Sequence, residues 1–442
     1  MATRAADQSP ATPADRQPRP RVLVHIGEPK TGTTFLQQVM WSNRAELAAQ
    51  GVVLPGHHPQ DHFRASQDLR GIEKRADDPA GSWTGEWEIL AHQARQAPRA
   101  AVISHELFSA VDGPQAEQAV RSLHPAEVHV VLTVRDMASL LPAEWQETIK
   151  HRNDRGWEDW LADVIDRESV DPDRRQWWFW RVHDTLAILD LWGRHVPADR
   201  IHVIMTPPQG SGNSLLWERF AALLGVDPGG VDLSRARANT SLGLPEIEFL
   251  RRLNQALPAE VPDWFYMWTV KEGVAHRALA ARPREGRLVL PGDREAWAKE
   301  QAEVLIGGLA SSGYDVIGDA GELRPRPSRE PGAVGPAAQQ ADRVLDAAVD
   351  AAAALVVNQY RKEYPAASPP PKRAGQARLA STGLAGAGLA STGLASRLEA
   401  AIASSPRLKR AVRDLSSRYP AVRRLRILTW RAMERTRARR HS

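Results

Sequence analysis

The stretch that decides the fold is Val22-Leu23-Val24-His25-Ile26-Gly27-Glu28-Pro29-Lys30-Thr31-Gly32-Thr33-Thr34, followed by an apolar-periodic run. The aliphatic residues before Gly27 predict a strand over residues 21–26, and the periodic run predicts a helix over residues 33–50. A loop with two glycines joins them, so backbone N–H groups and the positive end of the helix dipole meet at one point. We therefore predict that this loop binds an anion.

The position of the loop lysine separates this loop from that of the nucleotide triphosphatases. Gly27 and Gly32 occupy the glycine positions of G-x-x-x-x-G-K-[ST], but Thr33 stands where that pattern has its lysine. The lysine of the loop is Lys30, one of only eight lysines among the 58 basic residues of the chain. A lysine in the phosphate loop of such an arginine-rich chain indicates a chemical role.

The loop resembles the 5′-phosphosulfate loop of the PAPS-dependent sulfotransferases, a P-loop-like family whose core reads P-K-[ST]-G-T-[TS]. All six positions match, as Pro29, Lys30, Thr31, Gly32, Thr33 and Thr34. The resemblance implies 3′-phosphoadenosine 5′-phosphosulfate (PAPS) as co-substrate and no metal. It implies that loop N–H groups and the Thr33 and Thr34 hydroxyls hold the 5′-phosphate. Lys30 would then stabilise the charge that develops on the leaving phosphate.

A second phosphate contact is expected where a buried strand, predicted over residues 128–134, ends. Arg135 stands where the family has its 3′-phosphate arginine, and a guanidinium can hold a phosphate through two hydrogen bonds. The family usually adds a serine eight residues later, where this chain has Ala143; Ser139 is a nearer hydroxyl that can replace it. The alternative for Arg135 is an ion pair with Asp136. Residues 284–287 weakly resemble a late basic segment that closes over the 3′-phosphate.

The acceptor hydroxyl needs a base, and two candidates follow the strand predicted over residues 100–104. The resemblance implies His105, as in cytosolic sulfotransferases, or Glu106, since carbohydrate sulfotransferases more often use a glutamate. Successive residues at a strand end point to opposite faces, so we expect only one of them to reach the acceptor. A glutamate at a helix start beside a structural histidine is the alternative to both roles.

Strands alternating with helical segments predict a three-layer α/β fold with a central parallel sheet, followed by a helical and low-complexity C-terminal extension. The four predicted strands cover residues 21–26, 100–104, 128–134 and 201–205. The expected organisation is a disordered leader (1–20), a sulfotransferase-like catalytic domain (21–323), a linker (324–336), an Ala-rich helix (337–366), a low-complexity linker (367–397) and a basic amphipathic helical tail (398–442).

Two further groups of residues have a plain structural interpretation. His57, His58 and His62 have no standard metal-site spacing, so we expect them in a solvated loop. Tryptophans at helical spacing over residues 157–192 are expected in the core, although such rings can also stack on a sugar.

The positive charge of the chain belongs to its C-terminal part. Residues 371–442 contain 17 Lys and Arg against three acidic residues, within a net charge of +5. This pattern predicts peripheral contact with an anionic membrane or an acidic polymer, and nucleic acid is not expected as a partner. Because no membrane span or signal peptide is recognisable, we expect a cytoplasmic protein, peripheral at the inner membrane face. The chain has no cysteine, which excludes disulfides and a thiol nucleophile.

The leading hypothesis is a sulfotransferase that moves a sulfuryl group from PAPS to a hydroxyl, with an amine as second choice. The acceptor would be a carbohydrate, another small-molecule natural product or a lipid-linked molecule, and no motif names it. The alternatives are a nucleotide kinase or NTPase, which would need Mg²⁺ and lacks its lysine at Thr33, and a catalytically silent nucleotide-binding scaffold. Ala143 and the open choice of base keep the scaffold in consideration.

Overall fold

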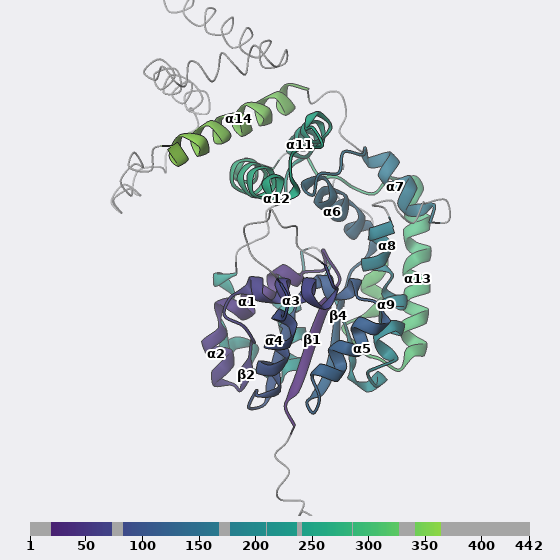
Figure 1. Ribbon diagram of the computed structural model, residues 1–442. Coiled ribbons are helices and arrows are strands. Elements are labelled where there is room, and N and C mark those ends of the chain that lie inside the picture. Colours follow the sequence, from purple (N-terminus) through teal and green to yellow (C-terminus); the bar gives the residue numbers. More distant parts are fainter. Residues whose placement is uncertain are drawn as a thin grey trace, which may run out of the picture. The chain divides into compact units, whose positions relative to one another are not determined.

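The computed structural model describes residues 19–72, 83–167, 177–208, 210–236, 241–284, 286–326 and 341–363. Within them, six parallel strands form a sheet in the order β2-β3-β1-β4-β5-β6, which confirms the predicted α/β class. Helices flank the strands (Figure 1). The strands are β1 (Arg21–Gly27), β2 (Val52–Val53), β3 (Ala100–Ser104), β4 (Glu127–Val134), β5 (Ile201–Met205) and β6 (Asp315–Ile317).

The order of the strands reverses at β1. Arg21 of β1 lies opposite Ala100 of β3 on one side and Glu127 of β4 on the other. The chain therefore builds β2 and β3 on one side of β1 and then crosses to place β4, β5 and β6 on the other side. In open parallel sheets a ligand binds beyond the carboxyl ends of the strands at such a switch point, which is where the phosphate loop leaves β1.

The long helix predicted over residues 33–50 is instead two helices that meet at Asn43. The Asn43 side-chain amide donates to the Val39 carbonyl (2.8 Å) and accepts from the Asp232 N–H (2.9 Å). These side-chain hydrogen bonds stabilise the end of one helix and the start of the next at Asn43. The α-helices are α1 (Thr33–Ser42), α2 (Arg44–Ala49), α3 (Pro59–Leu69), α4 (Glu86–Arg95), α5 (Gly113–Ser122), α6 (Met137–Lys150), α7 (Trp157–Ile165), α8 (Trp177–His183), α9 (Thr185–Gly193), α10 (Asn213–Leu224), α11 (Leu244–Ala256), α12 (Asp263–Tyr266), α13 (Glu295–Ser312) and α14 (Ala341–Glu363).

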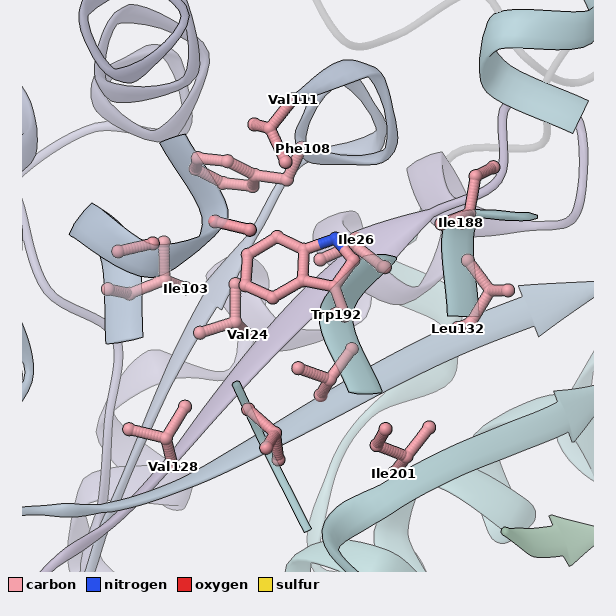
Figure 2. Close-up of a cluster of buried hydrophobic side chains, with 14 of the residues drawn as sticks. Val24, Ile26, Ile103, Phe108, Val111, Val128, Leu132, Ile188, Trp192 and Ile201 are labelled. Atoms are coloured by element: carbon pink, nitrogen blue, oxygen red, sulfur yellow. The ribbon is translucent and has the colours of Figure 1, made fainter. Parts of the chain in front are cut away.

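Alternate residues of the strands fill two separate cores, as the period of two requires. On one face, Val24 and Ile26 of β1 lie with Trp192 of α9 (Figure 2). On the other face, Leu23 lies in a cluster with Leu36 of α1 and Phe220 of α10. Burying each such side chain is worth about 1.5–3 kcal/mol, so the two faces hold β1, and the loop after it, in place.

A third core is built from helices and includes the tryptophans of α6 and α7. Trp157 and Trp160 are fully buried there, and Trp192 is fully buried against the sheet, which confirms the core interpretation for these three rings. Ala347 and Ala351 of α14 belong to the same helical cluster, so the Ala-rich helix packs against α11 and the π-helix η6 (Met267–Ala278).

Several predicted segments lie outside the described residues. These are the leader up to residue 18, most of the linker over 324–336, the low-complexity linker (367–397) and the basic tail (398–442). Among the helices that the structure describes, none combines the length and the apolar character needed to cross a membrane.

Candidate functional site

The phosphate loop depends on two glycines for its shape. Gly27 has φ +99°, and a Cβ there would lie 2.8 Å from the Cα of Glu106. Gly32 caps the N-terminus of α1 with φ +92°, and a Cβ there would collide with Leu216. Both positions require a left-handed backbone and a close approach, which only glycine allows without strain.

The loop is held from inside by hydroxyl groups. The buried Thr31 hydroxyl donates to the Glu28 carbonyl (2.6 Å) and lies 2.6 Å from the Thr133 hydroxyl of β4. The Thr206 hydroxyl, after β5, donates to the Thr31 carbonyl (2.7 Å). The Thr31 side chain therefore fixes the loop, while Thr33 and Thr34 open α1, whose first N–H groups can serve an anion.

The Lys30 side chain lies among carboxylates. Its Nζ is 2.5 Å from Glu147 Oε2 of α6. Burial lowers the pKa of Lys30, but the charges of Glu147, Glu144 and Glu106 outweigh burial and leave the pKa raised. Lys30 is therefore a fully charged ammonium, and its backbone has φ +60°, a conformation that is uncommon outside glycine.

A cavity of about 370 Å³ opens beside the loop, and its lining combines three predicted parts of the site. Gly32 of the loop, Arg135 after β4 and Arg287 of the late basic segment all line it. Arg135 also donates to the Lys30 carbonyl (3.4 Å). Burial lowers the pKa of Arg135, Asp136 raises it, and the charge of Arg287 lowers it further, so two guanidiniums lie close together. Such a pair of cations at one pocket suits a doubly charged phosphate.

The first turns of α6 form another wall of this cavity. Ser139 and Ala143 both line it, so the Ser139 hydroxyl lies on the same side of the cavity as Ala143, the position where the family usually has its serine. Asp136 caps α6 by accepting the Ser139 N–H (2.8 Å), which gives Asp136 a role other than an ion pair with Arg135, the alternative interpretation of that arginine.

His105 and Glu106 do not point to opposite faces. His105 Nδ1 lies 3.9 Å from Glu106 Oε2, because Glu106 already begins the 3₁₀ helix η2 (Glu106–Ala110) rather than continuing the strand. His105 Nδ1 accepts the Leu107 N–H (3.2 Å) and caps this helix. Since burial lowers the pKa of His105, the ring is neutral and carries its proton on Nε2, so neither nitrogen has a lone pair ready for an acceptor proton.

Glu106 carries an ionised carboxylate beside the loop. Burial raises its pKa, but His105, its own N–H, Gln37 and Lys30 outweigh burial and leave the pKa lowered. Gln37 of α1 donates to Glu106 Oε2 (3.3 Å) and so helps to hold the carboxylate beside the loop. Of the two candidate bases, Glu106 is therefore the one whose side chain is ionised and does not cap η2.

A buried ion cluster behind the loop was missed from the sequence. Glu28 accepts from the Thr185 hydroxyl (2.5 Å) and from His183 Nδ1 (3.3 Å), and Glu144 Oε2 lies 3.7 Å from His183 Nε2. Burial lowers the pKa of His183, but the two carboxylates raise it to about 9. The imidazolium thereby joins the loop, α6 and α8. No local pattern signals the cluster, because its members come from three distant segments.

The histidines after β2 have structural roles. His58 is exposed and caps α3, whereas His62 is fully buried: its Nε2 lies 2.9 Å from the Pro55 carbonyl, and its Nδ1 accepts the Ser104 N–H (3.1 Å). The expectation of a solvated loop is therefore wrong for His62, because α3 turns this side chain toward the end of β3.

No protein-family model and no curated protein matches this chain. Among solved structures, the chain is similar to a crystal structure of a sulfotransferase from Alicyclobacillus acidocaldarius, with 16% sequence identity and a TM-score of 0.33. The similarity covers 60% of this chain and 98% of the other. A likeness at this TM-score does not define a family, so the residues of the site carry the functional assignment.

Proposed function

We propose that this protein is a sulfotransferase that moves a sulfuryl group from PAPS to a hydroxyl of its acceptor. The observation that carries the proposal is the cavity that joins Gly32 of the loop to Arg135, Ser139 and Arg287. A nucleotide with phosphates at both its 5′ and 3′ positions matches such a site. The loop and the start of α1 supply N–H groups for one phosphate, and the two guanidiniums supply charge for the other.

The reaction divides naturally between Lys30 and Glu106. The acceptor oxygen forms a bond to sulfur while the bond from sulfur to the bridging oxygen breaks, which leaves adenosine 3′,5′-bisphosphate. Lys30 stabilises the negative charge that grows on the bridging oxygen. Glu106 accepts the proton of the acceptor hydroxyl, because it is ionised and His105 already uses its Nδ1 lone pair to cap η2.

The ion pair with Glu147 is compatible with this role of Lys30. An ammonium has three N–H donors, and the contact with Glu147 Oε2 uses one of them. Lys30 can therefore reach the leaving oxygen with another donor, while Glu147 holds the side chain.

The first alternative, a nucleotide kinase or NTPase, fits the loop less well. The position of its phosphate lysine is Thr33, whose side chain is buried at the start of α1. The second alternative, a silent scaffold, shares the nucleotide pocket and differs only in the absence of turnover.

Transfer from ³⁵S-labelled PAPS into the acceptors of a cell extract tests the proposal. We expect transfer by the parent protein and a loss of at least about 100-fold in Lys30→Ala, as removal of a transition-state donor produces. Lys299→Ala is the matched control, because Lys299 is exposed on α13. Transfer by Lys30→Ala at the parent rate would remove Lys30 from its role, and no transfer by a parent protein that still binds the nucleotide would favour the scaffold.

We also propose a cytoplasmic protein that meets an anionic membrane or an acidic polymer through residues 398–442. The support is the excess of basic residues in this part of the sequence, which lies outside the described residues.

A further inference from the structure

Gln146 of α6 is a buried glutamine in the wall of the cavity beside the phosphate loop. It is only 7% exposed, and it lines this cavity together with Arg135 and Arg287. Its side-chain amide makes no hydrogen bond to any residue that the structure describes. A buried amide without a partner is unfavourable, so an unpartnered amide in the wall of a cavity indicates that a ligand supplies the partner.

The residues of α6 that line the cavity share one face of the helix. Ser139, Pro142, Ala143 and Gln146 follow the spacing i, i+3, i+4 and i+7. Side chains on a helix lean toward its N-terminus, so the Gln146 side chain lies over the turn that contains Ala143. Because the side chain of Ala143 is a single methyl group, it leaves space there for the amide and for a ligand.

The guanidinium of Arg135 is linked to the same part of α6. Arg135 donates to the Lys30 carbonyl (3.4 Å), and Lys30 Nζ is 2.5 Å from Oε2 of Glu147, the residue after Gln146. One lysine therefore connects the Arg135 guanidinium to the turn that carries Gln146. The charge of Arg287 lowers the pKa of Arg135, so the second guanidinium is close by as well. The amide and the two guanidiniums can thus contact one ligand group.

A phosphate is the ligand group that suits this combination. The guanidiniums of Arg135 and Arg287 provide charge and N–H donors, and the Gln146 amide provides two uncharged N–H donors. A phosphate monoester has three terminal oxygens that accept hydrogen bonds, so it can use the amide in addition to the guanidiniums. An uncharged donor adds a contact without adding to the repulsion between the two arginines.

We infer that Gln146 is a ligand of the phosphate that Arg135 and Arg287 bind. Its amide donates an N–H to a phosphate oxygen from a position one helical turn after Ala143. The inference rests on the proposed function in one respect, that this phosphate is the 3′-phosphate of the nucleotide.

Calorimetry with adenosine 3′,5′-bisphosphate and adenosine 5′-monophosphate tests the inference without turnover, because the two nucleotides differ only in the 3′-phosphate. Gln146→Leu keeps the approximate size of the side chain and removes its donors. We expect this variant to bind the bisphosphate about 10-fold more weakly than the parent, as loss of a hydrogen bond to a charged group produces, and the monophosphate with less than about a 2-fold change. Gln118→Leu on α5 is the matched control, because Gln118 is exposed, and it should bind both nucleotides as the parent does.

Two further variants separate phosphate binding from packing. Gln146→Glu has a carboxylate of the same size and should weaken bisphosphate binding more than Gln146→Leu does, because the carboxylate repels the phosphate. Ala143→Ser, added to Gln146→Leu, returns a donor to the same helix face and should recover most of the lost affinity for the bisphosphate. Urea midpoints measured for every variant separate loss of the contact from loss of the fold.

The inference is overturned if Gln146→Leu binds the bisphosphate as the parent does, if it loses affinity equally for both nucleotides, or if Ala143→Ser brings no recovery. The parent protein distinguishes these results from a failure of the proposed function. A parent that prefers the bisphosphate to the monophosphate, with the same preference in Gln146→Leu, contradicts the role of Gln146 alone. A parent that does not prefer the bisphosphate contradicts the proposed function, because a site for the 3′-phosphate is then absent.

Discussion

The substitution Glu147→Gln removes the negative charge that pairs with Lys30, Lys150 and Lys271 and keeps the size of the side chain. At an effective dielectric constant of about 20, an ion pair at 2.5–3.0 Å is worth roughly 5–7 kcal/mol before desolvation. Three such attractions disappear, and the repulsion among the ammoniums is then reduced only by the more distant charges of Glu144 and Glu106. Part of the loss is offset, because a glutamine costs less to bury than a carboxylate and the ammoniums retain some exposure. We expect a net loss of about 3 kcal/mol in the free energy of unfolding.

Urea unfolding at pH 7 and fixed salt measures this loss. The matched control is Glu117→Gln on α5, which removes the same charge from an exposed pair with Arg121. An exposed pair contributes little, so the control should change the free energy of unfolding by no more than about 0.5 kcal/mol. If Glu147→Gln is as stable as the control variant, Lys30, Lys150 and Lys271 do not depend on this carboxylate and the reasoning is refuted.

The acid limb of the stability curve gives an independent check. Burial raises the pKa of Glu147, but Lys30, Lys150 and Lys271 hold it well below its ordinary value. A carboxyl whose pKa is depressed in the folded state stabilises the fold above its unfolded pKa of about 4.3 and loses that contribution as the pH falls through the folded value. The parent protein should therefore lose part of its advantage over Glu147→Gln below about pH 4.

Three further predictions concern the loop and its support. The pKa of His183 is raised to about 9, so its ion pairs stabilise the fold fully below about pH 6.5 and lose this contribution as the pH rises through 9. Urea midpoints of His183→Gln should therefore vary less over this pH range than those of the parent protein. Gly27→Ala should lower the free energy of unfolding in urea by about 3 kcal/mol, because its Cβ would meet Glu106. Gly71→Ala, with φ +64° and open space around its Cβ, should lower it by only about 1 kcal/mol. Equal losses would contradict the close approach of Gly27 to Glu106. Ser139→Ala should weaken the binding of adenosine 3′,5′-bisphosphate about 10-fold in calorimetry, and unchanged affinity would exclude this hydroxyl from the phosphate site.

The features that local sequence predicted are those whose cause is also local. β1, β3, β4 and β5 are buried, largely apolar runs, and they were located to within a residue or two. By contrast, β2 has two residues and β6 three, which is too short for a periodic pattern, and they pair only because β3 and β5 offer open edges. The helix α3 was not predicted, because most of its residues are polar and give no apolar periodicity.

The candidate site divides in the same way. The loop and Arg135 were predicted because six contiguous residues and one strand end carry them, and the structure brings both to one cavity. The ion cluster at His183 and the ion pairs of Glu147 with Lys30 and Lys271 could not be predicted, because each joins segments more than a hundred residues apart. The hydrogen bond from the Leu107 N–H that occupies His105 Nδ1 could not be predicted either, because it depends on the 3₁₀ helix η2 that begins at Glu106.

The central proposal is a site that binds both phosphates of adenosine 3′,5′-bisphosphate. Titration calorimetry with this nucleotide and with ATP, each with and without Mg²⁺, tests it most directly. We predict that the bisphosphate binds more tightly than ATP, independently of Mg²⁺, and that Arg135→Ala lowers its affinity at least 10-fold. Tighter binding of ATP that depends on Mg²⁺, or an Arg135→Ala variant with the parent affinity, would contradict it.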